Sequence, residues 1–437
     1  MDIKELYSFY QQHPVVTTDS RDCPQDSIFI ALKGESFDGN QFAIQALDKG
    51  CALAIVDDEQ VYHSYRGDKL MILVPDSLQA FKDLAREHRR RFDIPVIGIT
   101  GTNGKTTTKE LLRAVLAEKY NVMATEGNFN NDVGVPKTLL RLTPEHQIAV
   151  IEMGASHPGD IKTLAETAEP TCGLITNVGK AHLQGFGSLE GVVQTKGELY
   201  DNLASREGSI IFVNADNAHL MSILPRGVVT ERYTRRIDDT DSRVHGEVIA
   251  CDPFLRLRWR EGAGRWHEVE TRLIGSYNLD NALAAVTVGL HFGVEPEHIC
   301  HALQTYVPSN NRSQLTETQH NRLIVDAYNA NPASMTAALD NFSVMQVAPK
   351  MAILGEMREL GDSSHEEHVR MIEHLASCPF EEVWLVGTEF KDIACPYRKF
   401  EDVEQVKEAI AVSRPEGRYI LIKGSNGNRL FQLTEYL

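Results

Sequence analysis

The chain has 437 residues, too many for one hydrophobic core, and at roughly 150 residues per domain it predicts about three domains. Apolar residues make up 42% and charged residues 24%, which excludes a disordered chain or a fibre. The net charge of −17 argues against a nucleic-acid-binding protein, because such a surface needs clustered Lys and Arg. An anionic substrate remains possible, since backbone N–H groups can bind phosphate inside an acidic protein.

Cysteine usage and hydropathy favour a soluble, cytoplasmic protein. The seven cysteines are odd in number and include no Cys-x-x-Cys pair, so we expect neither a disulfide framework nor a zinc site. The first residues, MDIKELYSFYQQHP, lack the basic and apolar stretches of a signal peptide. No apolar run approaches the roughly 18 residues that a membrane span requires.

Residues 1–92 predict a small α/β domain. Strand-like runs are expected at Ser27–Leu32, Cys51–Val56 and Met71–Val74. A polar helix is expected over Leu78–Arg91, and the Ile94–Pro95 pair then breaks the chain because proline cannot extend that helix.

Residues 93–307 predict a mostly parallel α/β domain of the P-loop type, because apolar strand, turn and helix repeat from Val96 onwards. The expected strands are Val96–Thr100, Ala149–Met153, Leu174–Val178 and Ile210–Val213. Residues 243–274 alternate polar and apolar positions around Gly262–Gly264, which indicates an antiparallel insertion. Asn278–Phe292 returns to helical spacing.

Residues 308–437 predict a third, Rossmann-like α/β domain that begins with the polar linker 308–314. The expected strands are Leu323–Asp326, Met351–Leu354, Val383–Val386 and Tyr419–Ile422, with helical segments between them.

The strongest functional signal is the glycine-rich segment 97–107, IGITGTNGKTT. A strand leads into a glycine turn and then into a helix beginning near Thr106, so backbone N–H groups and the helix N-terminus can surround a nucleotide's phosphates. Lys105 would reach the outer phosphates, and the Thr106 hydroxyl would bind Mg²⁺. Ile99 stands where the common P-loop pattern has a glycine, so this is a variant loop.

Mg²⁺ prefers hard oxygen ligands. We expect them at the carboxyl edge of the sheet, where ligands bind in open α/β sheets. Glu152 closes one predicted strand, and His182 follows the next. Each alone could equally be a structural cap or a solvated side chain. Spacing gives no reason to choose Lys196, whose ammonium would repel Mg²⁺.

Several long motifs in one order resemble the Mur ligase family, over about residues 17–427. The segments that resemble its nucleotide and metal motifs are Thr100–Thr107, Thr125–Pro136, Ile151–Ala155 and Ala181–Glu198. Two segments, Asp326–Ser334 and Leu354–Gly361, are similar to the subgroup that adds D-alanyl-D-alanine to a UDP-muramoyl-tripeptide.

The resemblance implies which residues bind ATP and Mg²⁺. Those on the ATP side are Gly101, Thr102, Asn103, Gly104, Lys105, Thr106, Thr107, Arg312 and Asp326, with Asn278 and Asn281 on the adenine side. Those that ligate Mg²⁺ are Thr106, Glu152, His182 and Lys196. The resemblance implies that Lys196 is carbamylated, which turns a repelling ammonium into a carboxylate-like ligand. Lys105, Lys196, His182 and Glu152 are the expected catalytic residues.

The resemblance also implies the substrate contacts. Those on the UDP-sugar side are Ser20, Arg21, Lys33 and Gly34, and the others are Asn128, Asn130, Asn131, Asn329, Asn331 and Lys423. Two positions depart from the family pattern. Arg312 follows Ser-Asn-Asn where the family usually has Pro-Gly, and Asn426 stands where an arginine often follows Lys423-Gly-Ser. The role of the Lys423–Ser425 loop stays open.

The implied function is an ATP-dependent amide-forming ligase of peptidoglycan precursor synthesis, monomeric and without a nucleic-acid or membrane partner. The γ-phosphoryl group would move to the carboxylate of UDP-N-acetylmuramoyl-tripeptide, and D-alanyl-D-alanine would attack the acyl phosphate to give the pentapeptide, ADP and phosphate. Shielding this intermediate from water predicts domain closure about a hinge near Val307–Arg312.

Three alternatives remain: a sister ligase that adds another amino acid or glutamate, a nucleotide-switched binding protein, and a simple kinase. The sequence does not distinguish lysine from diaminopimelate as the third residue of the donor peptide.

Overall fold

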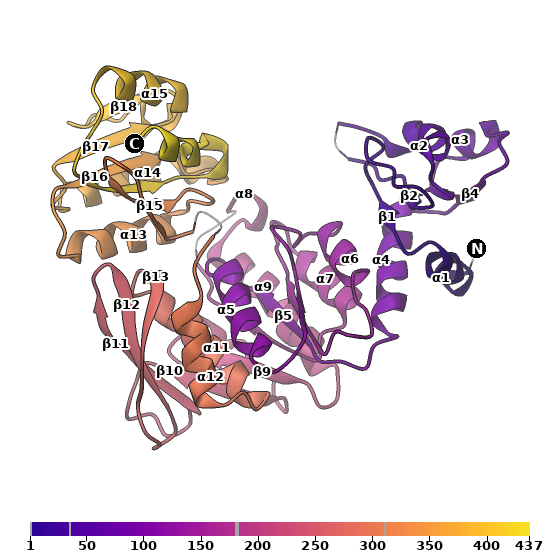
Figure 1. The fold of residues 1–437 in the computed structure, drawn as a ribbon, viewed down its shortest axis with the longest axis horizontal. Helices are drawn as coiled ribbons and strands as arrows, with labels where there is room; N and C mark the ends of the chain where they lie inside the picture. The colour runs from indigo at the N-terminus through magenta and orange to yellow at the C-terminus, as the bar shows by residue number, and fades with distance from the viewer. Residues whose placement is uncertain (1, 35, 180–182, 310–311) are drawn as a thin grey trace. The chain divides into compact units, whose positions relative to one another are not determined.

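A computed structural model describes residues 2–34, 36–179, 183–309 and 312–437 (Figure 1). The described residues build a four-stranded, a nine-stranded and a six-stranded sheet. By their internal contacts they divide into two compact units. The first unit is Met1–Gly98, Asn121–Gly154 and Asp160–Cys172, and the second is Ile99–Tyr120, Ala155–Gly159 and Gly173–Leu437. None of the helices described is both long enough and apolar enough to span a lipid bilayer.

The N-terminal sheet is wholly parallel, in the order β1-β2-β3-β4. Its strands are β1 (Val16–Thr17), β2 (Ile28–Ile30), β3 (Leu53–Val56) and β4 (Leu70–Leu73). Apolar residues of α1 (Ile3–Gln12) and α4 (Ser77–Arg89) pack on one face and those of α2 (Ala43–Lys49) on the other, while α3 (Glu59–Ser64) follows β3. The carboxyl ends of all four strands therefore lie at one edge, where ligands bind in open α/β sheets.

The central sheet has the order β13-β12-β11-β10-β9-β8-β5-β7-β6. Its strands are β5 (Val96–Thr100), β6 (Val122–Ala124), β7 (Ile148–Glu152), β8 (Cys172–Ile175), β9 (Ile210–Asn214), β10 (Val229–Thr234), β11 (Val244–Cys251), β12 (Phe254–Glu261) and β13 (His267–Ile274). The pairs β6–β7, β9–β10 and β10–β11 are parallel. Strands β11, β12 and β13 are antiparallel, as predicted for residues 243–274, and they extend the same sheet.

The sequence predicted two helices of this region, one beginning near Thr106 and one over Asn278–Phe292, and both are present. The described helices of this region are α5 (Lys105–Ala117), α6 (Gly134–Leu139), α7 (Asp160–Ala168), α8 (Leu183–Phe186), α9 (Leu189–Ala204), α10 (Ala218–Ser222), α11 (Asn278–His291) and α12 (Pro296–Thr305). Helix α5 starts at Lys105, one residue before the predicted start. Strand β8 ends at Ile175, whereas the prediction ran to Val178, because Thr176 and Asn177 leave the sheet to bind the glycine loop.

The C-terminal sheet has the order β14-β15-β19-β16-β17-β18. Its strands are β14 (Gln314–Glu317), β15 (Arg322–Asp326), β16 (Lys350–Gly355), β17 (Glu382–Val386), β18 (Arg398–Phe400) and β19 (Tyr419–Lys423). Only the pair β14–β15 is antiparallel among the pairs that the described residues form in this sheet.

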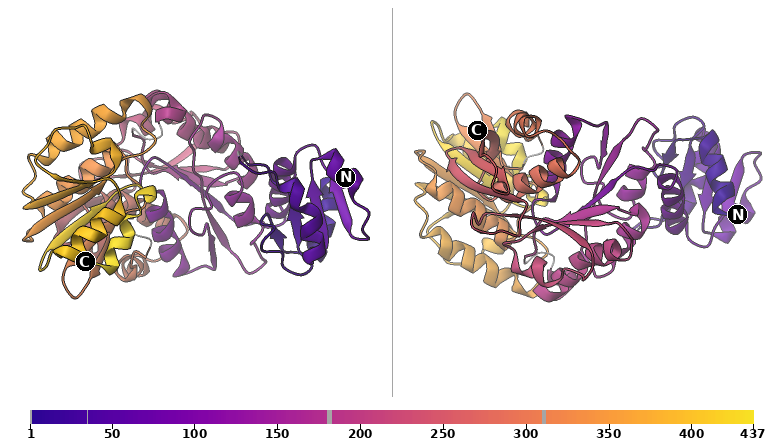
Figure 2. Two further views of the ribbon diagram at one scale, coloured as in Figure 1. Left: turned by 90° about the horizontal axis from the view of Figure 1, so that it is seen from above. Right: turned by 90° about the horizontal axis from the view of Figure 1, so that it is seen from below.

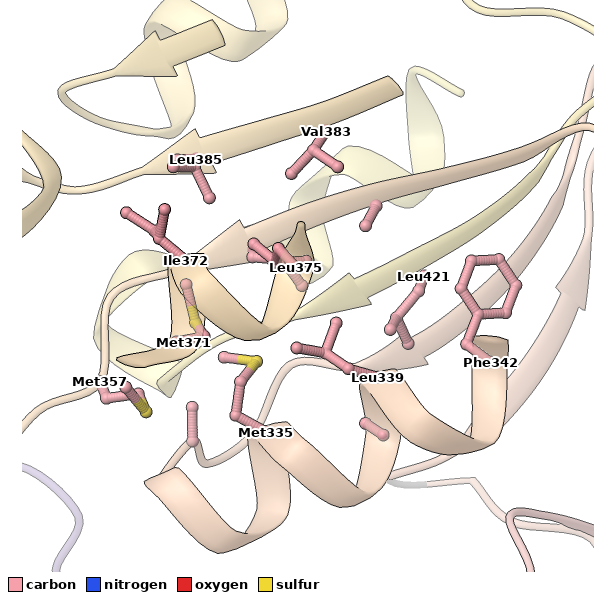
Figure 3. Packing of buried hydrophobic residues seen from close by; sticks show 14 of the residues in the cluster. Met335, Leu339, Phe342, Met357, Met371, Ile372, Leu375, Val383, Leu385 and Leu421 are labelled. Atoms are coloured by element: carbon pink, nitrogen blue, oxygen red, sulfur yellow. The ribbon is translucent and has the colours of Figure 1, made fainter. Parts of the chain in front are cut away.

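Helices cover both faces of the C-terminal sheet (Figure 2). On one face, Met335, Leu339 and Phe342 of α13 (Pro332–Val344) pack with α14 (Ser364–Leu375) against strand residues such as Leu421 (Figure 3). On the other face lies α15 (Val403–Val412). The predicted α/β fold is thus confirmed for all three sheets, and each sheet presents a carboxyl edge that carries candidate site residues.

Candidate functional site

The glycine loop between β5 and α5 has the geometry that the phosphate-binding prediction requires. Gly101 and Gly104 have φ angles of 145° and 79°, in the region that favours glycine. Lys105 begins α5, and its Nζ donates to the carbonyls of Gly101 at 2.7 Å and Thr102 at 3.1 Å. The Lys105 side chain therefore folds back over the loop, and its ammonium lies beside the N-terminus of α5. The Thr106 side chain is buried at the start of the same helix.

The residues that follow β8 hold the peptide of Asn103 in place. Asn177 accepts from the Asn103 N–H at 2.9 Å and donates to the Asn103 carbonyl at 3.0 Å. The Thr176 hydroxyl donates to that carbonyl at 2.6 Å. The loop is thereby fixed in shape, which is what a preorganised anion site needs. The sequence prediction missed Thr176 and Asn177, although polar residues directly after a buried strand were a usable signal.

The two asparagines predicted on the adenine side make internal hydrogen bonds. Asn278 donates to the Ile274 carbonyl at 2.8 Å, and Asn281 donates to the Asn278 side chain at 2.8 Å. Asn281 Oδ1 accepts from the Thr108 hydroxyl at 3.1 Å, and it lies where a side chain at position 104 would stand. These asparagines thus anchor α5 and the glycine loop to α11.

Of the predicted metal ligands, Lys196 lies in α9 and is only 2% exposed. Its Nζ is 5.4 Å from the centre of the Phe186 ring. A lysine is rarely buried to this extent unless its charge is paired or removed. His182 lies outside the described residues. Within the described part of the chain, no three His, Cys, Asp or Glu side chains gather as a metal site.

Glu152, the other predicted metal ligand, ends β7 and is 1% exposed. Its Oε1 accepts from the Asn130 amide at 2.8 Å, and its backbone N–H donates to the Thr125 hydroxyl at 3.0 Å. Asn130 therefore orients the carboxylate. Asn131 accepts from the Gly134 N–H at 2.8 Å at the start of α6, whereas the Asn128 side chain is exposed.

At the C-terminal sheet, Asp326 and Lys423 end the adjacent strands β15 and β19. Lys423 is 1% exposed, and its Nζ lies 2.6 Å from Asp326 Oδ2 and 3.3 Å from the Asn329 carbonyl. Its ammonium is thus engaged with the protein itself. The Arg312 guanidinium stacks on the Tyr328 ring at 4.1 Å, beside this pair of strands.

Asn331 caps α13 and also contacts the glycine loop. Its Oδ1 accepts from the Ser334 N–H at 2.9 Å, and its Nδ2 donates to Asn103 Oδ1 at 2.8 Å. The Asn103 Nδ2 in turn donates to Asn331 Oδ1 at a longer distance of 3.4 Å. Asn329 by contrast has an exposed side chain. The structure therefore brings Asn331, and not Asn329, to a predicted ATP-side residue.

His368 is a residue whose role only the structure reveals. It is fully buried, and its Nε2 accepts from the Met357 N–H at 2.9 Å while Nδ1 lies 2.7 Å from the Ser364 carbonyl. These partners require the neutral ring with the proton on Nδ1. Burial lowers the pKa of the His368 imidazole, which agrees with that neutral state. His368 thus fixes the segment that follows β16.

The same segment is tied to the loop after β19. The Ser425 hydroxyl donates to the Glu356 carbonyl at 3.1 Å and accepts from the Arg358 N–H at 3.3 Å. The Lys423–Ser425 loop, whose role the sequence left open, thus joins the ends of β15 and β16 through Lys423 and Ser425.

The predicted UDP-sugar residues lie at the carboxyl edge of the N-terminal sheet. Ser20 and Arg21 follow β1, and the exposed Arg21 pairs with Asp19 at 2.7 Å. Lys33 and Gly34 follow β2, and Lys33 Nζ lies 2.8 Å from Asp57, which follows β3. Parallel strand order thus places the exposed Arg21 and the half-exposed Lys33 at the edge where an anionic ligand would bind.

Nearly the whole chain is similar to known proteins. Family models described as "Mur ligase family, catalytic domain", "Mur ligase middle domain" and "Mur ligase, glutamate ligase domain" match residues 14–89, 99–289 and 311–426 respectively. A relative from Bacillus subtilis named UDP-N-acetylmuramoyl-tripeptide–D-alanyl-D-alanine ligase is 33% identical over 97% of this chain and 92% of its own length.

Two solved structures are similar over nearly their full lengths. MurF from Acinetobacter baumannii is 30% identical with a TM-score of 0.86, covering 96% of this chain and 92% of that one. The MurF ligase from Thermotoga maritima, solved in complex with ADP, is 27% identical with a TM-score of 0.85, covering 97% of this chain and 96% of that one.

Proposed function

This chain belongs to the Mur ligase family, and from that premise we propose that it joins D-alanyl-D-alanine to UDP-N-acetylmuramoyl-tripeptide at the expense of ATP. The observation that carries the proposal is the preorganised glycine loop, in a chain similar from end to end to ligases of that name. The products are UDP-N-acetylmuramoyl-pentapeptide, ADP and phosphate.

ATP binding at the glycine loop rests on three features of this loop. Gly101 and Gly104 adopt positive φ angles and let Thr176 and Asn281 pack against the loop backbone, and the N-terminus of α5 attracts negative charge. Lys105 already lies over the loop and adds a positive charge to it. Arg312 and Asp326 are proposed to contact the nucleotide from the third domain. Gly104, Asn278 and Asn281 act by holding the loop.

A Mg²⁺ site fits the donor chemistry of the chain. We propose Thr106, Glu152, His182 and a carbamylated Lys196 as its ligands, because hydroxyl and carboxylate oxygens are what Mg²⁺ prefers. The carbamylated form of Lys196 is supported by the resemblance to the family; the residue lies in α9 and is 2% exposed. Bound Mg²⁺ supplies charge neutralisation for the phosphoryl group that is transferred.

The reaction proceeds in two balanced steps. A carboxylate oxygen of the donor tripeptide attacks the γ-phosphorus of ATP, the bond to the β-phosphate breaks, and ADP leaves. The D-alanyl-D-alanine amine then attacks the acyl carbon, loses a proton, and phosphate leaves as the amide forms. Lys105 stabilises negative charge that develops on the phosphoryl group, and Asn130 keeps the Glu152 carboxylate oriented.

The donor and acceptor are proposed to bind through residues of three sheet edges. Ser20, Arg21, Lys33 and Gly34 would contact the UDP moiety, and Asn128, Asn130 and Asn131 the rest of the donor. Asn329, Asn331 and Lys423 are proposed on the acceptor side. For Lys423 the role is indirect, since its ammonium is engaged with Asp326.

The acyl phosphate must be protected from water, so we propose that the third domain closes about Val307–Arg312. Residues 310 and 311 of that segment lie outside the described part of the chain. Small-angle scattering with an ATP analogue and the UDP substrate should show compaction, and an unchanged radius contradicts closure.

We further propose domain boundaries near residues 92 and 307, a monomeric state and a cytoplasmic location. The boundaries agree with matches that cover 14–89, 99–289 and 311–426. Limited proteolysis tests the boundaries, light scattering tests the monomer, and cell fractionation tests the location.

Phosphate release tests the function directly. It should require ATP, Mg²⁺, UDP-N-acetylmuramoyl-tripeptide and D-alanyl-D-alanine together, and the product should be the UDP-pentapeptide. Release with a single amino acid in place of the dipeptide would assign a sister ligase instead. A stable phosphorylated product without an amide would assign a kinase, and nucleotide binding without acceptor-dependent release would assign a nucleotide-switched protein.

A further inference from the structure

We propose that Asp57 is the positioning residue of the UDP-binding edge, acting by clamping both flanks of the loop that follows β2. The inference rests on the proposed function, since it concerns how this chain holds its nucleotide-sugar donor. Asp57 follows β3 and is not part of any motif that the sequence analysis singled out.

Asp57 contacts both sides of this loop. On the outgoing side, Lys33 Nζ lies 2.8 Å from Asp57 Oδ1. On the returning side, the Asn40 amide donates to the same oxygen at 2.7 Å and accepts from the Asp57 backbone N–H at 3.0 Å. Asn40 is fully buried, in the short helix η1 (Gly39–Phe42). One carboxylate therefore joins residues that lie on opposite sides of the loop.

The other oxygen of Asp57 connects this clamp to the rigid part of the domain. Its Oδ2 accepts from the Ser77 N–H at 3.2 Å, at the first turn of α4. The side chain of Asp57 is only 10% exposed, whereas Lys33 is 51% exposed. Burial alone would raise the pKa of the Asp57 carboxyl, but the bonds from Lys33, Asn40 and Ser77 hold it below its usual value. The carboxylate is thus charged and fully used by the protein.

In this arrangement Asp57 positions Lys33 and does not itself contact UDP. Asp57 repels a diphosphate, so it does not serve as a ligand for UDP. It instead fixes where the half-exposed Lys33 ammonium stands relative to Asn40 before the donor arrives. Without the clamp, UDP binding must also order several backbone residues. The free energy of that ordering exceeds the binding free energy gained from one freed, solvated ammonium.

The test is UDP binding to the full chain by calorimetry. Asp57→Ala should raise the Kd for UDP about tenfold, a change of about one pKd unit. Asp58→Ala is the matched control, because among the described residues the neighbouring Asp58 carboxylate accepts from the Gln60 and Val61 N–H groups at the start of α3 and takes no part in the clamp. Its Kd should not rise above that of the unmodified chain, because the change removes a negative charge near Lys33 and leaves the clamp in place.

Two further readouts distinguish positioning from general damage. Asn40→Ala should weaken UDP binding similarly, and the double variant should be no weaker than the worse single one, because both remove the same clamp. At saturating donor, Asp57→Ala should keep its kcat while KM for the donor rises. If Asp57→Ala does not fold, Asp57→Asn takes its place, with a smaller rise in Kd expected.

An Asp57 variant that binds UDP as tightly as the Asp58 control overturns the inference, and so does tighter binding, which would mean that Asp57 acts only by repulsion. An unmodified chain that releases phosphate with both substrates while the Asp57 variant is unchanged overturns this inference alone. An unmodified chain that neither binds UDP nor uses the donor overturns the proposed function as well.

Discussion

Replacing Gly104 by alanine tests whether the glycine loop depends on its contact with α11. The backbone at Gly104 has a φ of 79°, and an added Cβ would lie 2.6 Å from Asn281 Oδ1. An alanine in the left-handed region costs roughly 1–2 kcal/mol, and the enforced shift of a packed neighbour adds about 1–3 kcal/mol. We therefore expect Gly104→Ala to lower the free energy of unfolding of the central domain by about 2–5 kcal/mol and to weaken ADP binding.

Gly208 offers a matched control within the same chain. Its φ is 77°, and among the described residues nothing lies within 4 Å of an added Cβ. Gly208→Ala should thus show only the backbone cost of roughly 1–2 kcal/mol. Urea unfolding and calorimetry with ADP measure both variants. In an Asn281→Ala background the cost of Gly104→Ala should fall to that of Gly208→Ala, and an unchanged cost would refute the steric argument.

Three more predictions concern buried titratable side chains. Because burial lowers the pKa of His368 in the folded protein, the unfolded chain takes up the proton first, so the contribution of His368 to stability is complete above about pH 6.5 and is lost as the pH falls below it. Urea midpoints across that range should show this loss, and His368→Gln should remove that part of the pH dependence. Lys423→Met leaves Asp326 without its partner and should cost about 3 kcal/mol in urea unfolding, whereas Lys423→Met combined with Asp326→Leu should cost less. Lys196→Ala should abolish phosphate release and regain part of it with added short carboxylates, and full activity without them would contradict the metal-ligand role.

The sequence predicted those parts of the fold that depend on burial. Val96–Thr100 was placed without error, because a strand covered on both faces is a continuous apolar run. Strand β10 was missed, since Glu231 and Arg232 interrupt its apolar pattern. The structure accounts for Glu231 by its ion pair with Arg243 at 2.7 Å, a contact that no local pattern contains.

The residues of the candidate site also divide into those that the sequence predicts and those that only the structure reveals. The glycine loop and the residues at strand ends could be predicted from the sequence, because consecutive residues carry their chemistry. The supports of the site were not: Asn177 and Asp57 act through partners 74 and 17 positions away in sequence. The asparagines at 278 and 281 were expected near adenine, and their observed hydrogen bonds are internal to the protein.

The bond between Thr108 and Asn281 joins positions 173 residues apart. During synthesis the glycine loop leaves the ribosome long before α11 exists, so its support is missing for most of the time that the central domain is being made. At roughly 5–20 residues per second, that interval is on the order of ten to thirty seconds. The nascent chain should therefore acquire ATP only after residue 281 has emerged, which delays nucleotide capture until the sheet that must hold it is nearly whole.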